Sequence, residues 1–149
     1  MAAGDTKLFN EFVLKDREGK YTLMDTWQIS FISDTFASVS SDLANPTTAS
    51  VTITSGGNVA ASYTLANKSL SRSTSLITFD ADDIGQIAKD ALNAADVRCA
   101  ILVNVTSGNE LSQIWDMTSD GTTPLDLVNN DFTFNFGAAG INTSFNASA

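Results

Sequence analysis

The chain has 149 residues, of which 43% are hydrophobic, and it carries 17 acidic and 8 basic residues for a net charge of −9 at pH 7. This apolar content is typical of a globular protein and disfavours a disordered chain. The negative charge repels phosphate backbones and anionic lipid surfaces, so we expect neither nucleic acid nor a membrane as a partner.

The chain contains no histidine and a single cysteine, Cys99. Without histidine the usual general base, the Ser-His-Asp and Cys-His arrangements and the commonest transition-metal ligand are missing. One cysteine forms neither an internal disulfide nor a thiolate zinc cluster. The glycine motifs of nucleotide-binding proteins are also absent. The sequence therefore predicts a protein that is not an enzyme and that uses no cofactor and no metal.

The sequence predicts a single β-sandwich domain over residues 1–149, with an arm at its N-terminus and a short tail at its C-terminus. Residues 1–20 mix basic and acidic side chains, which is typical of a solvated arm. Residues 143–149 are small and polar apart from one phenylalanine, and we expect them to form a short flexible tail. No apolar run resembles an export signal or a membrane span, so we expect synthesis and folding in a cytoplasm.

Alternation of apolar and polar residues with a period of two predicts a series of strands. In the first, Trp27, Ile29 and Phe31 share one face. A later stretch that starts at Val97 is apolar on both sides for part of its length, so it should be a central strand. The sequence TSGNE that follows should form a tight turn, and the next strand should pair with this one as a hairpin. The predicted strands lie at residues 27–31, 51–53, 75–79, 97–105 and 111–117.

Two segments depart from this alternation. Residues 34–62 are rich in Ser, Thr, Ala and Asn, and are expected to form a long excursion with a Gly-Gly turn at residues 56–57. In residues 81–93 the apolar side chains recur at helical spacing, which predicts one short amphipathic α-helix with Asp80 as its N-cap. The residues at that spacing are Ile84, Ile87, Ala88, Ala91 and Leu92.

The stretch NNDFTFNFG predicts the last strand, with Phe132, Phe134 and Phe136 on one face. We expect these rings to form the inner face of a sheet, pressed against the face of residues 27–31. The predicted fold class is therefore mainly β: an antiparallel β-sandwich, jelly-roll-like or immunoglobulin-like, with one short helix near residues 81–93.

Two further functional interpretations rest on individual side chains. Glu110 and Asp116 have an even spacing that places both on one face of a strand, and a glycoside hydrolase needs two carboxylates. We favour solvated carboxylates at the rim of a sheet. Trp27 or Trp115 would make the protein a carbohydrate-binding module if either ring were exposed, but strict strand alternation favours core positions.

Four stretches of the chain share their patterns with a known group of proteins: KLFNEFVL, DTWQISFIS, DVRCAILVNVTSGNELSQIWDM and NNDFTFNFGAAGI. Together they resemble a family of small virion proteins of tailed bacteriophages, which includes capsid decoration, or cement, proteins. The resemblance implies a β-sandwich that binds the outer surface of the assembled capsid and resists the pressure of packaged DNA. A tail or baseplate component of the same particle is the alternative.

The resemblance also implies the partners: the major capsid protein, and further copies of this chain in a dimer or trimer at the exterior of the virion. We expect the contacts to come from the N-terminal arm and from the loop after Asp34, because exposed apolar residues need a partner. The candidate interface residues are Leu8, Phe9, Phe12 and Phe36.

Overall fold

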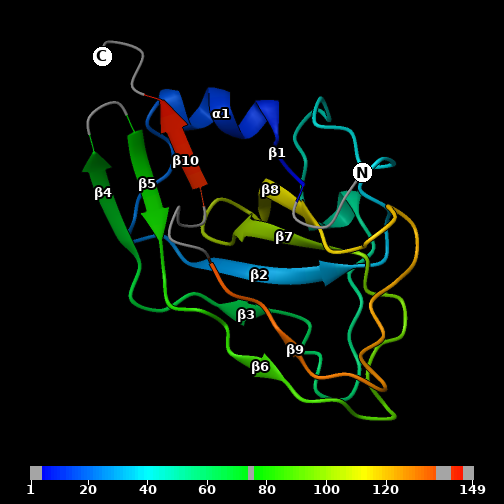
Figure 1. Ribbon diagram of the computed structural model, residues 1–149. Coiled ribbons are helices and arrows are strands. Elements are labelled where there is room, and N and C mark those ends of the chain that lie inside the picture. The colour runs from blue at the N-terminus through cyan, green and yellow to red at the C-terminus, as the bar shows by residue number, and fades with distance from the viewer. Residues whose placement is uncertain (1–4, 74–75, 137–141, 146–149) are drawn as a thin grey trace.

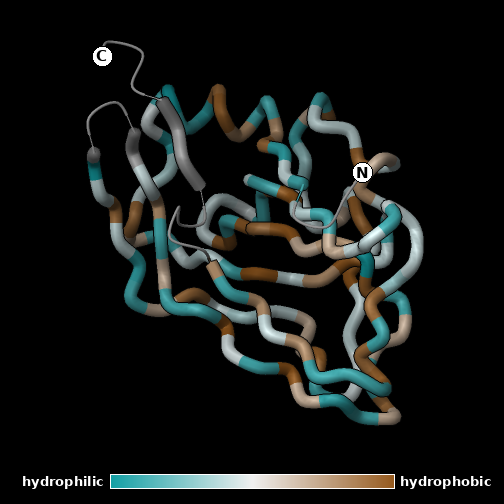
Figure 2. The backbone as a smooth tube through the Cα atoms, in the orientation of Figure 1, coloured by the Kyte–Doolittle hydropathy of each residue, from teal (hydrophilic) through white to brown (hydrophobic). Residues whose placement is uncertain are grey.

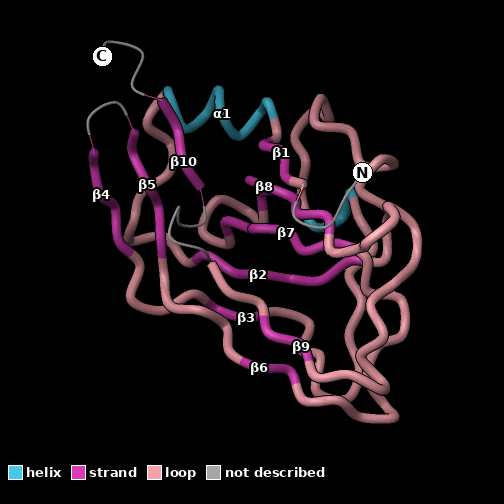
Figure 3. Tube along the Cα trace, viewed as in Figure 1, coloured by secondary structure: helices cyan, strands magenta, loops and turns pink. Residues whose placement is uncertain are grey.

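The computed structural model describes residues 5–73, 76–136 and 142–145, and it is mainly β, with one short α-helix in this part of the chain (Figures 1 and 3). The helix α1 spans Asn10–Arg17, and a short 3-10 helix spans Thr48–Ser50. The strands are β1 (Thr6–Leu8), β2 (Trp27–Ile32), β3 (Tyr63–Thr64), β4 (Ser69–Ser73), β5 (Leu76–Asp80), β6 (Gln86–Ile87), β7 (Cys99–Asn104), β8 (Glu110–Asp116), β9 (Phe132–Thr133) and β10 (Asn142–Phe145).

The centre of the protein is a five-stranded antiparallel sheet with the order β1-β8-β7-β2-β3. β7 is the middle strand and every one of its residues is buried, as its apolar sequence predicted. β8 follows it as the predicted hairpin partner, and β2 pairs with its other side along the whole strand. Figure 2 shows hydrophobic residues concentrated in these central strands. The predicted mainly β, sandwich-like fold is confirmed.

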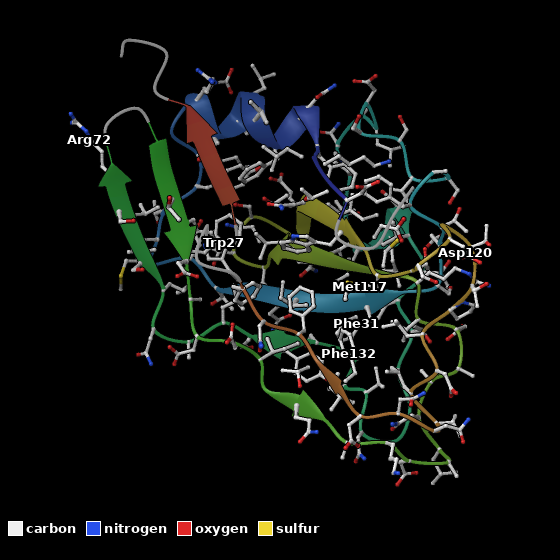
Figure 4. The ribbon with its side chains drawn as sticks, viewed as in Figure 1. Trp27, Phe31, Arg72, Met117, Asp120 and Phe132 are labelled. Carbon is white, nitrogen blue, oxygen red and sulfur yellow. The ribbon has the colours of Figure 1, made fainter. Side chains whose placement is uncertain are left out.

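Three phenylalanine rings near the C-terminus cover one face of this sheet, as the sequence predicted. The ring centroid of Phe31 lies 6.3 Å from that of Phe132 and 6.1 Å from that of Phe134; Figure 4 labels Phe31 and Phe132. Trp115 lies 5.7 Å from Phe134, which in turn contacts Phe136 at 5.3 Å. Burial of one such ring contributes roughly 1.5–3 kcal/mol, so the cluster fixes this segment on the sheet.

Two details of that prediction are wrong. The regular strand β9 covers only Phe132–Thr133, where it pairs with β6 instead of forming a longer strand. Trp27 faces a different group of rings, with Phe12, Tyr21 and Phe79 at centroid distances of 6.1, 5.9 and 5.3 Å. Two aromatic clusters therefore cover the sheet, one toward each end of β2.

Residues 81–93, predicted as an amphipathic helix, contain no helix. Gly85 has a φ of +83°, in the left-handed region that a right-handed helix excludes. Leu92, expected on the buried face of the helix, is 77% exposed. Ile87 instead pairs with Phe132 between β6 and β9 and is buried. Tertiary pairing has overridden the local helical spacing.

The one helix of the described residues lies in the segment predicted as a solvated arm, residues 1–20. β1 joins the sheet as the neighbour of β8, and α1 follows directly. Phe9, Phe12 and Val13 have the i, i+3, i+4 spacing of a helix face, with both rings buried and Phe12 stacked on Tyr21 at 4.9 Å. The arm is therefore part of the fold from residue 6 onward.

A second, three-stranded sheet with the order β10-β5-β4 runs across one end of the first (Figure 1). Phe79 of β5 joins the two sheets by packing on Trp27. β10 pairs with β5 along its whole length, so residues 143–145 form a strand where the sequence predicted a flexible tail. The rest of that predicted tail, residues 146–149, lies outside the described residues.

The excursion over residues 34–62 contains less strand than predicted. The strand predicted at residues 51–53 is reduced to an isolated bridge between Ile53 and Ile32, and two more isolated bridges join Thr47 to Glu110 and Gly56 to Val59. The predicted glycine turn is present, and Gly57 has a φ of +57°. A Cβ atom on Gly57 would lie 2.7 Å from the backbone nitrogen of Asn93, so this turn has room for glycine alone.

Candidate interaction surface

Strand β4 is the outermost strand of the three-stranded sheet and pairs with β5 on one side only. When one face of a strand is covered, exposure alternates along it. In β4 the four consecutive residues from Ser69 to Arg72 are all exposed, Leu70 by 57%. Among the described residues, none pairs with the outer row of backbone N–H and C=O groups of β4, and both faces of Ser69 to Arg72 are open to a partner.

The start of β4 is held to the turn that precedes β2. Lys68 Nζ donates a hydrogen bond to the backbone oxygen of Asp25. The Asp25 carboxylate accepts a hydrogen bond from Asn104 Nδ2 at 2.8 Å. Burial opposes its charge, but the hydrogen bonds from Asn104 and Thr22 lower the pKa of Asp25. Met24, the residue before Asp25, is 88% exposed. We define the β4 surface as Met24, Lys68, Leu70 and Arg72.

The β4 surface carries two basic residues, Lys68 and Arg72, of which Lys68 lies beside Asp25. Residues 66–79 contain two basic residues and no acidic one, while the whole chain carries a net charge of −9. The ion pairs of the described residues involve Glu11 or Glu110, so Arg72 belongs to none of them. Figure 4 shows Arg72 pointing away from the body of the protein at the outer strand. A guanidinium that has no ion-pair partner in the described part of the chain is suited to a carboxylate or an aromatic face of a partner.

A shallow groove of about 200 Å³ lies beside the edge strand β3. Asp82 accepts a hydrogen bond from Asn67 Nδ2 at 2.6 Å, and Asp83 accepts one from the Phe136 backbone nitrogen at 2.6 Å. The second oxygen of each carboxylate accepts no hydrogen bond from a described residue. Tyr63 and two partly satisfied carboxylates thus belong to one groove, and such a combination of residues is favourable for a cation. Its lining residues are Tyr63, Thr64, Ala66, Asp82, Asp83 and Ile84.

Tyr63 is held rigidly at the side of the groove. Its hydroxyl donates a hydrogen bond to the Asn58 carbonyl at 3.2 Å and accepts one from the Ala60 N–H at 2.9 Å. Its ring packs edge-on against Phe31 with the centroids 5.9 Å apart. A ring fixed in this way loses little conformational freedom when a ligand binds against it.

The residues predicted to contact a capsid are largely buried within the chain itself. Phe9, Phe12 and Phe36 are 0%, 8% and 3% exposed, and Leu8 is half-buried. Lys7 Nζ lies 4.4 Å from the centre of the Phe36 ring, and burial lowers its pKa. The predicted exposure is wrong because β1 and α1 fold into the sheet. These residues stabilise the core instead of offering an apolar contact.

Glu110 and Asp116, considered as a catalytic pair, lie on opposite faces of the sheet. β7 is regular from Cys99 to Asn104, and residues five apart on a regular strand point to opposite faces. Cys99 pairs with Asp116 and Asn104 pairs with Glu110, because a bulge adds one residue to β8. The two carboxylates are also about 20 Å apart along the strand, whereas glycosidases need about 5–9.5 Å. The predicted shared face is wrong.

Glu110 connects α1 and the segment after it to β8. Its carboxylate accepts hydrogen bonds from Lys15 Nζ at 3.0 Å, from Lys20 Nζ at 2.6 Å and from the Tyr21 hydroxyl at 2.5 Å. Burial alone would raise the pKa of Glu110, but these hydrogen bonds outweigh it and lower the pKa to about 2. Burial and the bond to Glu110 raise the pKa of Tyr21. Glu110 is a fixed structural charge.

Asp116 and Cys99 are buried side by side across the β7–β8 pair. One Asp116 oxygen accepts hydrogen bonds from the Thr118 backbone N–H at 2.9 Å and hydroxyl at 2.7 Å. Burial and the nearby Asp116 charge raise the pKa of the Cys99 thiol to about 12. The thiol therefore stays protonated at neutral pH and packs as a small apolar group.

Neither tryptophan offers an open ring to a carbohydrate. Trp27 is 4% exposed, and its indole N–H donates a hydrogen bond to the Thr22 carbonyl at 3.2 Å. Trp115 is half-buried against Phe134 and Phe136. The core position that strand alternation predicted for Trp27 is confirmed.

Within residues 5–73, 76–136 and 142–145, no three His, Cys, Asp or Glu side chains are grouped to hold a metal ion. In the same part of the chain, no helix has the length and apolarity needed to cross a bilayer. Comparison of the sequence and structure with known protein families, curated proteins and solved structures gave no match. Among the described residues, the β4 surface and the groove lined by Tyr63, Asp82 and Asp83, called the acidic groove, are thus the candidate contact sites for a partner.

Proposed function

We propose that this protein is a structural component of a tailed-bacteriophage virion, which binds the outer surface of the assembled capsid as a decoration or cement protein. The observation that carries a structural role is strand β4, which is paired on one side and open on both faces. The assignment to a capsid is supported by the four stretches that resemble phage virion proteins. Its partners are the major capsid protein and further copies of the chain.

The fold suits a protein that works by adhesion. Its central sheet is closely packed, and the smaller sheet that carries β4 is fixed to it through Phe79 and Trp27. A rigid surface loses little entropy on binding, and repetition over a capsid multiplies the strength of each contact. The net charge of −9 disfavours contact with packaged DNA and suits the outside of the shell.

Binding to purified capsids tests the proposal. Capsids of the parent phage that lack the protein are mixed with increasing amounts of it and sedimented. We expect saturable binding at a fixed copy number per capsid, together with a rise in the temperature at which the capsid breaks open. No binding to capsids, or binding to isolated tails alone, would contradict a decoration role, and immunogold labelling of intact virions separates head from tail.

Two leucine variants test whether the β4 surface takes part in this binding. Leu70→Asp places a charge on the β4 surface, and we expect it to weaken capsid binding by about tenfold or more, about 1.4 kcal/mol. Leu92→Asp is the matched control, because Leu92 is 77% exposed and lies outside the β4 surface. Equal binding by both variants would remove the β4 surface from the proposal. Deletion of residues 2–12 is not a suitable test of the N-terminal segment as a capsid contact, because it removes strand β1 and the buried Phe9 and would therefore disrupt the fold.

A further inference from the structure

Arg72 and the acidic groove are chemically complementary but do not meet within one chain. Arg72 makes no ion pair with a described residue, and each of Asp82 and Asp83 keeps one carboxylate oxygen without a hydrogen bond from the described part. The guanidinium has five N–H donors in a planar fork that matches carboxylate oxygens and stacks on aromatic rings. Tyr63, Asp82 and Asp83 are among the residues that line one groove of about 200 Å³.

We propose that two copies of this chain associate by placing Arg72 of each in the Tyr63–Asp82–Asp83 groove of the other. The proposal rests on the homo-oligomer part of the proposed function and names its contact. Each chain contributes one arginine and one groove, so the contact forms twice around a two-fold axis, as in most homodimers. The groove is incomplete without the arginine of the second copy.

The positions of the two features favour this reciprocal contact. β4 pairs along β5, and Asp82 and Asp83 follow immediately after β5 ends at Asp80. Arg72 pairs with Ile77 near the start of β5, so Arg72 and the two aspartates lie toward opposite ends of the β4–β5 side of the protein, as the course of the chain in Figure 1 shows. Two copies that meet through this side bring both pairs together in one interface.

Charge selects a second copy as the occupant. Two molecules of net charge −9 repel one another over most of their surfaces, and residues 66–79 are a stretch with basic residues and no acidic one. Docking of Arg72 against Asp82 and Asp83 turns this repulsion into attraction at the contact. An acidic strand of another protein would use Arg72 but leave the groove empty.

A charge-reversal pair distinguishes these possibilities by sedimentation velocity of the purified full chain. We expect the wild type to dimerise, and each of Arg72→Glu and the double variant Asp82→Lys/Asp83→Lys to raise the dimer dissociation constant by about 100-fold. In an equimolar mixture of the two variants, both contacts of a heterodimer can form. In one contact the charges are reversed, because the glutamate introduced by Arg72→Glu meets the lysines introduced by Asp82→Lys/Asp83→Lys. Arg72 of the second variant meets the native Asp82 and Asp83 of the first and restores the other. The mixture is therefore expected to form heterodimers, and dimerisation should weaken as salt rises.

Arg17→Glu is the matched control, since it makes the same change of net charge at an exposed residue of α1. We expect it to dimerise like the wild type, and thermal melts confirm that every variant is folded. A dimer that is insensitive to Arg72→Glu, or a mixture that stays monomeric, would overturn the contact while leaving an oligomer in place. A wild type that is monomeric throughout would overturn both, whereas the capsid-binding test stands separately.

Discussion

Replacing Phe31 with alanine is expected to lower the free energy of unfolding by about 3–5 kcal/mol. Phe31 is fully buried and is the one ring that contacts Tyr63, Phe132 and Phe134 together, each edge-on. Its removal leaves a cavity between the central sheet and the segment that covers it. A loss of this size is a large part of the total stability of a typical domain, about 5–15 kcal/mol.

Urea denaturation followed by circular dichroism measures this effect. Leu92→Ala is the control, because Leu92 is 77% exposed and its truncation should change stability by no more than about 0.5 kcal/mol. A loss below about 1 kcal/mol for Phe31→Ala would mean that the aromatic cluster does not anchor the C-terminal segment. The assignment of the sheet face to the core would then be wrong.

Glu110→Gln is expected to cost about 2–3 kcal/mol of stability at pH 7. Its carboxylate is the common acceptor for two lysines and Tyr21, and it joins the N-terminal segment to β8. A neutral amide leaves Lys20 without its charge partner and leaves Lys15 with Glu11 alone. Glu11→Gln is the matched control, since Glu11 pairs with the same Lys15 at 3.5 Å on the surface of α1 and should contribute about 0.5 kcal/mol or less.

The pH dependence of stability gives the same prediction a second readout. The pKa of Glu110 in the fold is about 2, below its ordinary value of 4.5, so its contribution is complete above pH 4.5 and is lost as pH falls toward 2. We therefore expect the unfolding free energies of wild type and Glu110→Gln to differ at pH 7 and to converge near pH 2. A difference that stays constant over this range would mean that the charge of Glu110 is not what stabilises the fold.

The central sheet was predictable because its strands carry strong local signals. β2 alternates with aromatic residues on one side, and β7 is apolar on both sides, which only a middle strand satisfies. The turn TSGNE then specified a hairpin and its partner β8. The inward direction of Phe132, Phe134 and Phe136 also followed from alternation alone, although regular pairing covers only the start of that segment.

Features that depend on contacts between distant segments were not predictable in the same way. The helical spacing in residues 81–93 is real, but Gly85 and the pairing of Ile87 with Phe132 decide the structure. The signal for α1 was present in Phe9, Phe12 and Val13, and the dense charges around them concealed it. The bulge in β8 places Glu110 and Asp116 on opposite faces of the sheet, and no local sequence pattern predicts a bulge at this position.

The candidate interaction surface was missed for two physical reasons. β4 has the sequence SLSRS, which lacks the β-branched and aromatic residues that mark a strand, and it exists because β5 provides a partner. The groove joins residues 63–66 to residues 82–84, which only the folded chain brings together. The acid-free run of residues 66–79 within an acidic chain was the one sequence signal for the surface.

A cryo-EM map of the parent virion tests the central claim most directly. We expect density that fits this chain on the outer surface of the capsid, in pairs related by two-fold axes, with Arg72 of each copy at the Tyr63–Asp82–Asp83 groove of the other. Density for the chain in the tail alone, or a complete map of the particle with no place for the chain, would contradict a role as a capsid decoration protein.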